Sequence, residues 1–83
     1  MVWGRVQGVG YRAWVARLAG QHDMAGTVQN TAEGAVEVHV RGPSAEMPRF
    51  EARLLEGPVF ARVTNVTRTD SGQTLPAEFR ILR

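Results

Sequence analysis

The sequence contains no cysteine and no lysine, and both absences narrow the possible chemistry. Without cysteine there is no disulfide, no thiolate nucleophile and no cysteine-bound zinc, which fits a reducing compartment and predicts a cytoplasmic location. Without lysine, all ten basic side chains are arginines. Two interpretations of this bias stay open: a genomic preference for arginine, or recognition of phosphate and carboxylate groups by planar guanidinium groups.

Long apolar runs and dense positive charge are also missing. No run approaches the ~18 apolar residues that a membrane span needs, and no secretory signal pattern follows Met1. The net charge is only +2, and the arginines are scattered among eight acidic residues. A nucleic-acid-binding surface typically gathers basic residues into a stripe with exposed aromatic side chains. We therefore expect neither a membrane nor a nucleic acid as a partner.

The composition is that of a folded protein. Of the 83 residues, 43% are hydrophobic and 22% are charged, which are ordinary proportions for a globular chain and argue against disorder. This length suffices for one core and leaves no room for a second. We expect one domain over residues 1–83, and a monomer as the default state of so small a domain.

The periodicity of the apolar residues predicts five strands and two helices. In chain order, they are a strand over 1–6, a helix from 11 to a turn at 22–23, strands over 25–30 and 35–41 joined by a hairpin turn at 31–34, a helix ending at 57, a bulged strand over 61–69, a turn at 70–72, and a short strand around Phe79 and Ile81. This order is typical of the α+β, ferredoxin-like split βαβ fold (βαββαβ) with a short extra C-terminal strand. Right-handed crossovers place both helices on one face of an antiparallel or mixed sheet.

Two of these elements have distinct faces. In the strand over 35–41, alternation predicts one buried and one solvated face. The buried face comprises Val36, Val38 and Val40, and the solvated face comprises Glu37, His39 and Arg41. The second helix is expected to bury Met47, Phe50, Leu54 and Leu55. Its N-cap is either Ser44 or Met47, and Gly57 followed by proline is a strong stop signal.

A glycine-rich stretch, GRVQGVGYR, joins the first strand to the first helix. From Gly8 to Ala13 it fits G-x-G-x-x-A, the dinucleotide-binding pattern. We reject that interpretation because the second strand turns directly into a hairpin, so no parallel crossover builds the required sheet. The glycines either permit a tight turn or let the amides form an anion-binding nest at the helix N-terminus. Arg12 lies in the first helical turn, where a positive charge is unfavourable against the helix dipole. Its presence there indicates a nearby anion and favours the interpretation of the loop as a phosphate cradle.

A second polar residue is expected beside this loop. If the first two strands are parallel, as the split βαβ order requires, their C-terminal ends lie at the same edge of the sheet. Asn30 ends the second strand, and Arg12 follows the first. The topology therefore predicts that these residues, 18 positions apart, flank one pocket. Neither histidine has a metal-ligand spacing to a partner, so no metal is expected.

With these residues in view, the sequence resembles the acylphosphatase family over nearly its whole length. The first family motif, G-x-V-Q-G-V-x-F-R, is matched at Gly4, Val6, Gln7, Gly8, Val9 and Arg12. The second motif is matched at Gly26, Val28, Asn30, Gly34, Val36 and Gly42. Tyr11 stands where the family usually has phenylalanine, and Thr27 stands where it usually has an aromatic residue.

The resemblance implies hydrolysis of the carboxyl–phosphate bond of a small acyl phosphate, without a cofactor or metal, to a carboxylate and inorganic phosphate. It implies that Arg12 binds the phosphoryl oxygens and that Asn30 orients the attacking water. It also implies a cradle of main-chain amides from Gln7, Gly8, Val9, Gly10 and Tyr11. Acetyl, carbamoyl and glycolytic acyl phosphates and phosphorylated aspartate all present the same reacting group.

Three alternative functions are considered. The first is a non-catalytic, phosphate-binding regulatory module of the same fold. The second is the N-terminal domain of a larger carbamoyl-transfer maturation protein, which the lack of zinc-finger cysteines disfavours. The third is a ferredoxin-like RNA binder, which needs exposed aromatic residues on its central strands, where this sequence has charged ones. The presence of both Arg12 and Asn30 favours the enzyme.

Overall fold

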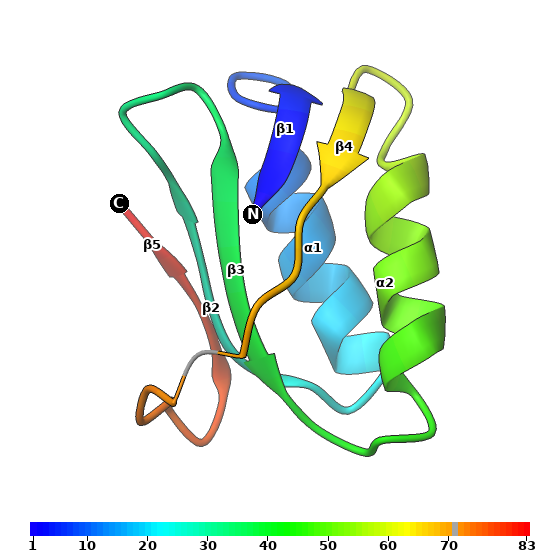
Figure 1. The fold of residues 1–83 in the computed structure, drawn as a ribbon, viewed down its shortest axis with the longest axis vertical. Coiled ribbons are helices and arrows are strands. Elements are labelled where there is room, and N and C mark those ends of the chain that lie inside the picture. The colour runs from blue at the N-terminus through cyan, green and yellow to red at the C-terminus, as the bar shows by residue number, and fades with distance from the viewer. Residues whose placement is uncertain (71) are drawn as a thin grey trace.

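The computed structural model describes residues 1–70 and 72–83, and Figure 1 shows how their helices and strands are arranged. The elements are β1 (Val2–Arg5), α1 (Tyr11–Gln21), β2 (Ala25–Asn30), β3 (Val36–Arg41), α2 (Met47–Glu56), β4 (Arg62–Val66) and β5 (Phe79–Leu82). Their order is the predicted one. Several strands are shorter than predicted, because pairing with a neighbour, rather than apolar alternation alone, decides where a strand ends.

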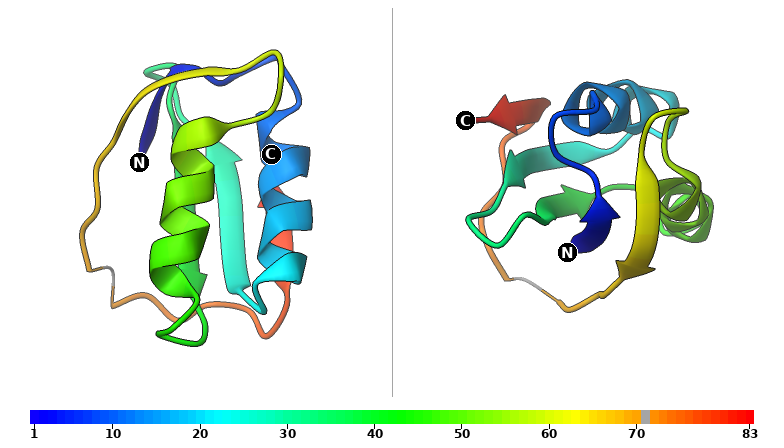
Figure 2. Two further views of the ribbon diagram at one scale, coloured as in Figure 1. Left: turned by 90° about the vertical axis from the view of Figure 1, so that its right-hand side faces the viewer. Right: turned by 90° about the horizontal axis from the view of Figure 1, so that it is seen from above.

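The strands form a mixed sheet in the order β4-β1-β3-β2-β5. β3 pairs antiparallel with both β1 and β2, so β1 and β2 run parallel to each other. β5 adds to the sheet by pairing parallel with β2. Both helices lie on the same face of the sheet (Figure 2). The predicted ferredoxin-like α+β fold, with its extra C-terminal strand, is confirmed.

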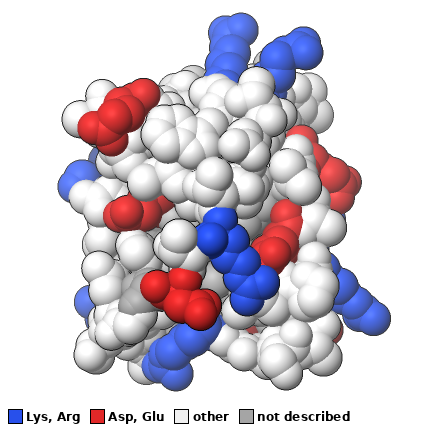
Figure 3. Space-filling view, viewed as in Figure 1, with Lys and Arg blue, Asp and Glu red and all other residues white. Residues whose placement is uncertain are grey.

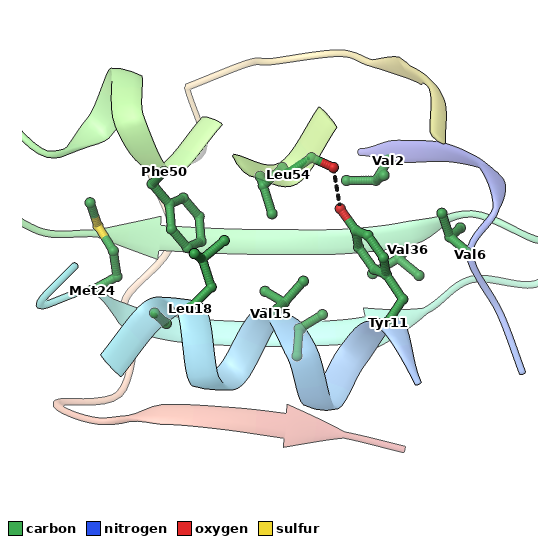
Figure 4. Close-up of a cluster of buried hydrophobic side chains, with 11 residues drawn as sticks. Val2, Val6, Tyr11, Val15, Leu18, Met24, Val36, Phe50 and Leu54 are labelled. Carbon is green, nitrogen blue, oxygen red and sulfur yellow. Dashed lines mark hydrogen bonds between the residues drawn. The ribbon is translucent and has the colours of Figure 1, made fainter. Parts of the chain in front are cut away.

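The core lies between the helices and the sheet. Tyr11, Val15 and Leu18 project from α1 toward Phe50 and Leu54 of α2 (Figure 4), and each is at most 5% exposed. The buried strand residues that meet them are Val2, Val28 and Val36, together with Val6 in the loop after β1. Burial of each such side chain contributes about 1.5–3 kcal/mol. These contacts fix α1, and therefore its N-terminus, against the sheet.

Two expectations for α2 are wrong. Leu55 is 54% exposed, because it lies about 100° around the helix from Leu54, outside the narrow stripe that faces the core. The N-cap is Glu46, and no side chain of a described residue caps the helix there. Ser44 instead takes part in the preceding turn, and the Glu46 carboxylate lies 2.8 Å from Nδ1 of His22 at the end of α1. The predicted end is confirmed, since the Gly57 amide donates to the helix carbonyl of Arg53.

The expectation of one fully buried face on β3 is only partly confirmed. Val36 is fully buried, whereas Val38 and Val40 are half-buried. The reason is a cavity of about 300 Å³ between this half of β3 and α2, which both valines line. On the other face, Glu37 and His39 are also half-buried, and the two side chains pair at 3.3 Å.

The bulge predicted in the fourth strand is confirmed. The register of β4 against β1 shifts between Val63 and Asn65, so Thr64 is the extra residue. β4 is shorter than the predicted range of 61–69, because it pairs only along the short strand β1. The turn predicted at 70–72 includes a residue outside the described part of the chain.

The buried ring of Tyr11 carries a polar group that the fold satisfies. Its hydroxyl donates to the Leu54 carbonyl of α2 at 2.8 Å (Figure 4). Burial raises the pKa of Tyr11 far above its ordinary value of about 10. The ring therefore stays neutral in the folded protein at pH values where it ionises in the unfolded chain.

We expect the free energy of unfolding to fall as the pH rises above about 10, because only the unfolded chain then releases the phenol proton. With one tyrosine, no lysine and no cysteine, no other side chain competes in this range. Tyr11→Phe should abolish the loss, while at neutral pH it should cost about 1–3 kcal/mol because the Leu54 carbonyl loses its donor. Urea unfolding across this pH range measures both effects. Parallel pH curves for the two proteins would contradict the assignment.

Candidate active site

The glycine loop between β1 and α1 leaves main-chain amides open to a ligand. Gly8 and Gly10 have φ angles of 73° and 78°, in the left-handed region that favours glycine. Gly10 is the N-cap of α1, and no side chain in the described chain caps the helix or places an acid in its first turn. The first N–H groups of a helix have no partner within it. This end of α1 is therefore positively polarised and suited to an anion.

Arg12 lies in the first turn of α1, and the C-terminal strand fixes its guanidinium. Its Nη1 atom donates to the Leu82 carbonyl of β5 at 3.1 Å, a contact between residues 70 positions apart. The side chain is half-buried. Since a cation at a helix N-terminus is disfavoured by the dipole, this contact with β5 helps to hold Arg12 in place without an anion.

Asn30 ends β2 and has an unused polar atom. Its Oδ1 atom is buried and accepts no hydrogen bond from the described residues. A buried acceptor without a partner costs about 1–3 kcal/mol, and such atoms in folded proteins call for an explanation. An external donor at this position, such as a water molecule, removes that cost.

One cavity brings the loop, Arg12 and Asn30 together. It has a volume of about 250 Å³ and is lined by Val6, Gly8, Gly10, Tyr11, Arg12, Ala13, Asn30, Ile81 and Arg83. The predicted juxtaposition of Arg12 and Asn30 is thus present, because β1 and β2 are parallel neighbours of β3. The lining carries two arginines and no aspartate, glutamate or histidine, so its charge favours an anion.

The other predicted loop residues have additional tasks. The Gln7 side chain donates from Nε2 to the carbonyls of Thr31 and Ala35, each at 2.8 Å, and so holds the loop against the β2–β3 turn. Val9 packs against the core, and the Tyr11 ring is buried in it. Their side chains are thus engaged elsewhere in the fold. That their main-chain N–H groups bind a ligand stays a prediction.

Four residues of the cavity wall were missed by the sequence reasoning, of which Val6 and Ala13 directly flank the predicted loop. Ile81 and Arg83 come from β5 and the position after it. The alternation of Phe79 and Ile81, extended by two residues, was a usable signal, because it places Arg83 on the same face. What the sequence could not supply was the pairing of β5 with β2, which brings this face beside Asn30.

Gln7→Ala should loosen the loop. Loss of two hydrogen bonds to partly buried carbonyls should lower the free energy of unfolding by about 1–3 kcal/mol. It should also weaken binding of inorganic phosphate, because the loop amides lose their fixed position. Urea unfolding and titration calorimetry measure the two effects, with Gln21→Ala on the exposed end of α1 as the matched control. Unchanged phosphate affinity in a destabilised variant would limit Gln7 to a role in stability.

The described part of the chain offers no metal site, because it contains no group of three histidine, aspartate or glutamate side chains placed to hold a metal ion. None of its helices is long and apolar enough to cross a membrane. On the face seen in Figure 3, basic and acidic side chains are interspersed. Metal independence stays a prediction.

Comparison with known proteins agrees with this geometry. The Acylphosphatase family model matches residues 1–81. Acylphosphatase 2 of Ralstonia nicotianae is 42% identical over 81 residues, which cover 96% of this chain and 85% of that protein. The crystal structure of acylphosphatase from Bacillus subtilis superposes with a TM-score of 0.82 at 34% identity, over 99% of this chain and 92% of that chain. HypF of T. kodakarensis has a TM-score of 0.85 at 29% identity, over 98% of this chain but only 11% of its own. This chain therefore belongs to the acylphosphatase family.

Proposed function

We propose that this acylphosphatase hydrolyses the carboxyl–phosphate bond of small acyl phosphates through Arg12, Asn30 and the amides of the glycine loop. The observation that carries the proposal is the shared cavity, in which a helix N-terminus, a tethered arginine and an unpartnered amide oxygen converge. We further propose one domain over residues 1–83 that acts as a monomer, for which the short length of the chain is the support. A cytoplasmic location is also proposed, supported by the cysteine-free sequence.

The loop and Arg12 would bind the phosphoryl group. The main-chain N–H groups of residues 7–11 would donate to its peripheral oxygens, aided by the dipole of α1. Arg12 would add charge-assisted hydrogen bonds, two in parallel if it binds side-on. Because these donors are already fixed by the fold, they need little rearrangement as negative charge shifts in the transition state.

Asn30 would orient the attacking water. Its free Oδ1 atom can accept a hydrogen bond from the water, which turns a lone pair of the water oxygen toward phosphorus. An amide does not titrate, so the proton would pass to a phosphoryl oxygen and not to the protein. Asn30 therefore contributes by positioning the attacking water, and correct positioning of a reactant alone raises reaction rates by large factors.

The leaving group needs little help from the protein. Cleavage of the P–O bond to the acyl group releases a carboxylate, whose parent acid has a pKa of about 4. Such a group departs as an anion without a general acid. The cavity matches this requirement, since no side-chain carboxyl or imidazole group of the described residues lines it.

Arg12→Ala should lower kcat/KM for benzoyl phosphate by at least about 100–1,000-fold, because it removes the side-chain cation that binds the transferred group. The assay is run in EDTA, which also tests metal independence. Arg17→Ala, an exposed arginine on the same helix, is the matched control and should keep full activity.

Three outcomes separate the candidate functions. Rapid turnover that is lost in Arg12→Ala supports the enzyme. A folded wild-type protein that binds inorganic phosphate without turnover supports the non-catalytic, phosphate-binding module. Turnover that EDTA abolishes contradicts the metal-free mechanism.

Asn30→Ala should affect kcat more than substrate binding. Loss of the group that places the water should lower kcat by about 100-fold, while KM and the inhibition constant of phosphate change little. Asn65→Ala on the distant strand β4 is the matched control. An Asn30→Ala protein with unchanged kcat would remove the proposed role.

A further inference from the structure

The cavity contains a second arginine whose position follows from the register of the sheet. β5 pairs with β2 so that Ile81 lies opposite Val28 and Leu82 opposite Gln29. The next step of this ladder places Arg83 opposite Asn30. Side chains two positions apart share a face, so Arg83 lies on the face of Ile81, and both line the cavity.

Arg83 has no acidic partner in the described part of the chain. Arg80, on the opposite face of β5, pairs with Glu78 at 3.4 Å. By contrast, Arg83 lies in a wall without an acidic residue, where Arg12 is the other cation. Both arginines line the same cavity, so an anion bound in it is attracted by two positive charges.

The chemistry of the ligand accounts for two guanidinium groups. A phosphoryl group carries a charge of about −1.5 to −2 near neutral pH and offers three acceptor oxygens. Arg12 supplies one positive charge, and one of its N–H groups is already used by the Leu82 carbonyl. A second arginine opposite Asn30 therefore balances the remaining charge, which the neutral amide of Asn30 cannot do, and supplies further donors.

We propose that Arg83 is a second phosphate-binding arginine, which raises the affinity for the dianion equally in the ground state and the transition state. The proposal rests on the proposed function of this cavity. Arg83 is exposed and, unlike Arg12, is not tethered by a hydrogen bond in the described structure. It therefore contributes uniform binding, which appears in KM and not in kcat.

The test compares Arg83→Gln with Arg80→Gln, which removes the same charge from the opposite face of the same C-terminal segment. Binding of inorganic phosphate is measured by titration calorimetry, and kcat and KM are measured with benzoyl phosphate. In Arg83→Gln we expect about a tenfold rise in both the Kd for phosphate and KM, as for loss of one exposed charge-assisted hydrogen bond. The kcat should stay within about twofold. Arg80→Gln should match wild type, and Arg83→Lys should recover part of the affinity.

Other results would overturn the proposal. An unchanged phosphate Kd in folded Arg83→Gln, or an equal loss in Arg80→Gln, shows that Arg83 does not bind phosphate. Succinyl and butyryl phosphate, which differ by a distal carboxylate, provide a further check. Loss of activity confined to succinyl phosphate would place Arg83 on the acyl group instead.

The phosphate titration also separates this inference from the proposed function. If the wild-type protein hydrolyses no acyl phosphate but Arg83→Gln still binds phosphate about tenfold more weakly, the hydrolase mechanism fails and the role of Arg83 stands. If turnover depends on Arg12 while Arg83→Gln is unchanged in KM and Kd, the hydrolase mechanism stands and the role of Arg83 fails.

Discussion

The antiparallel pairing of β3 with both β1 and β2 is the constraint on which the candidate site depends. Val36 is paired with Val2 on one side and with Asn30 on the other, and it is fully buried. This double pairing makes β1 and β2 parallel. The loop after β1 and the residue that ends β2 therefore meet, although the chain between them forms a complete helix. The core residues of α1 then fix the helix N-terminus over the same point.

The site also contains two features that are unfavourable in an empty folded protein. A cation lies at the positive end of a helix dipole, and a buried amide oxygen has no donor among the described residues. Local rules are broken in this way mainly at functional sites, where a ligand restores the balance. A phosphoryl anion with an attacking water would satisfy both, because the anion neutralises Arg12 and the water donates to Asn30.

Much of the fold could be predicted because its signals are local. The glycine loop, the helix that begins at Tyr11 and the hairpin between β2 and β3 depend on turn residues and periodicity within a few positions. The errors arose where distant contacts decide. Leu55 is apolar but lies outside the stripe that packs against β4 and α1, and Glu46 is held at the start of α2 by His22. Neither contact leaves a pattern in the local sequence.

The same distinction applies within the site. Its binding groups are encoded locally, but their positions depend on long-range contacts: Gln7 with the β2–β3 turn, and Arg12 with β5. β5 is an edge strand that pairs with one other strand, and two of its four residues, Ile81 and Leu82, are 44% and 37% exposed. Elements with so little burial open more readily than the core. Detachment of β5 would release Arg12 and withdraw Arg83 together, so a phosphate held by both arginines would in turn stabilise the attachment of β5.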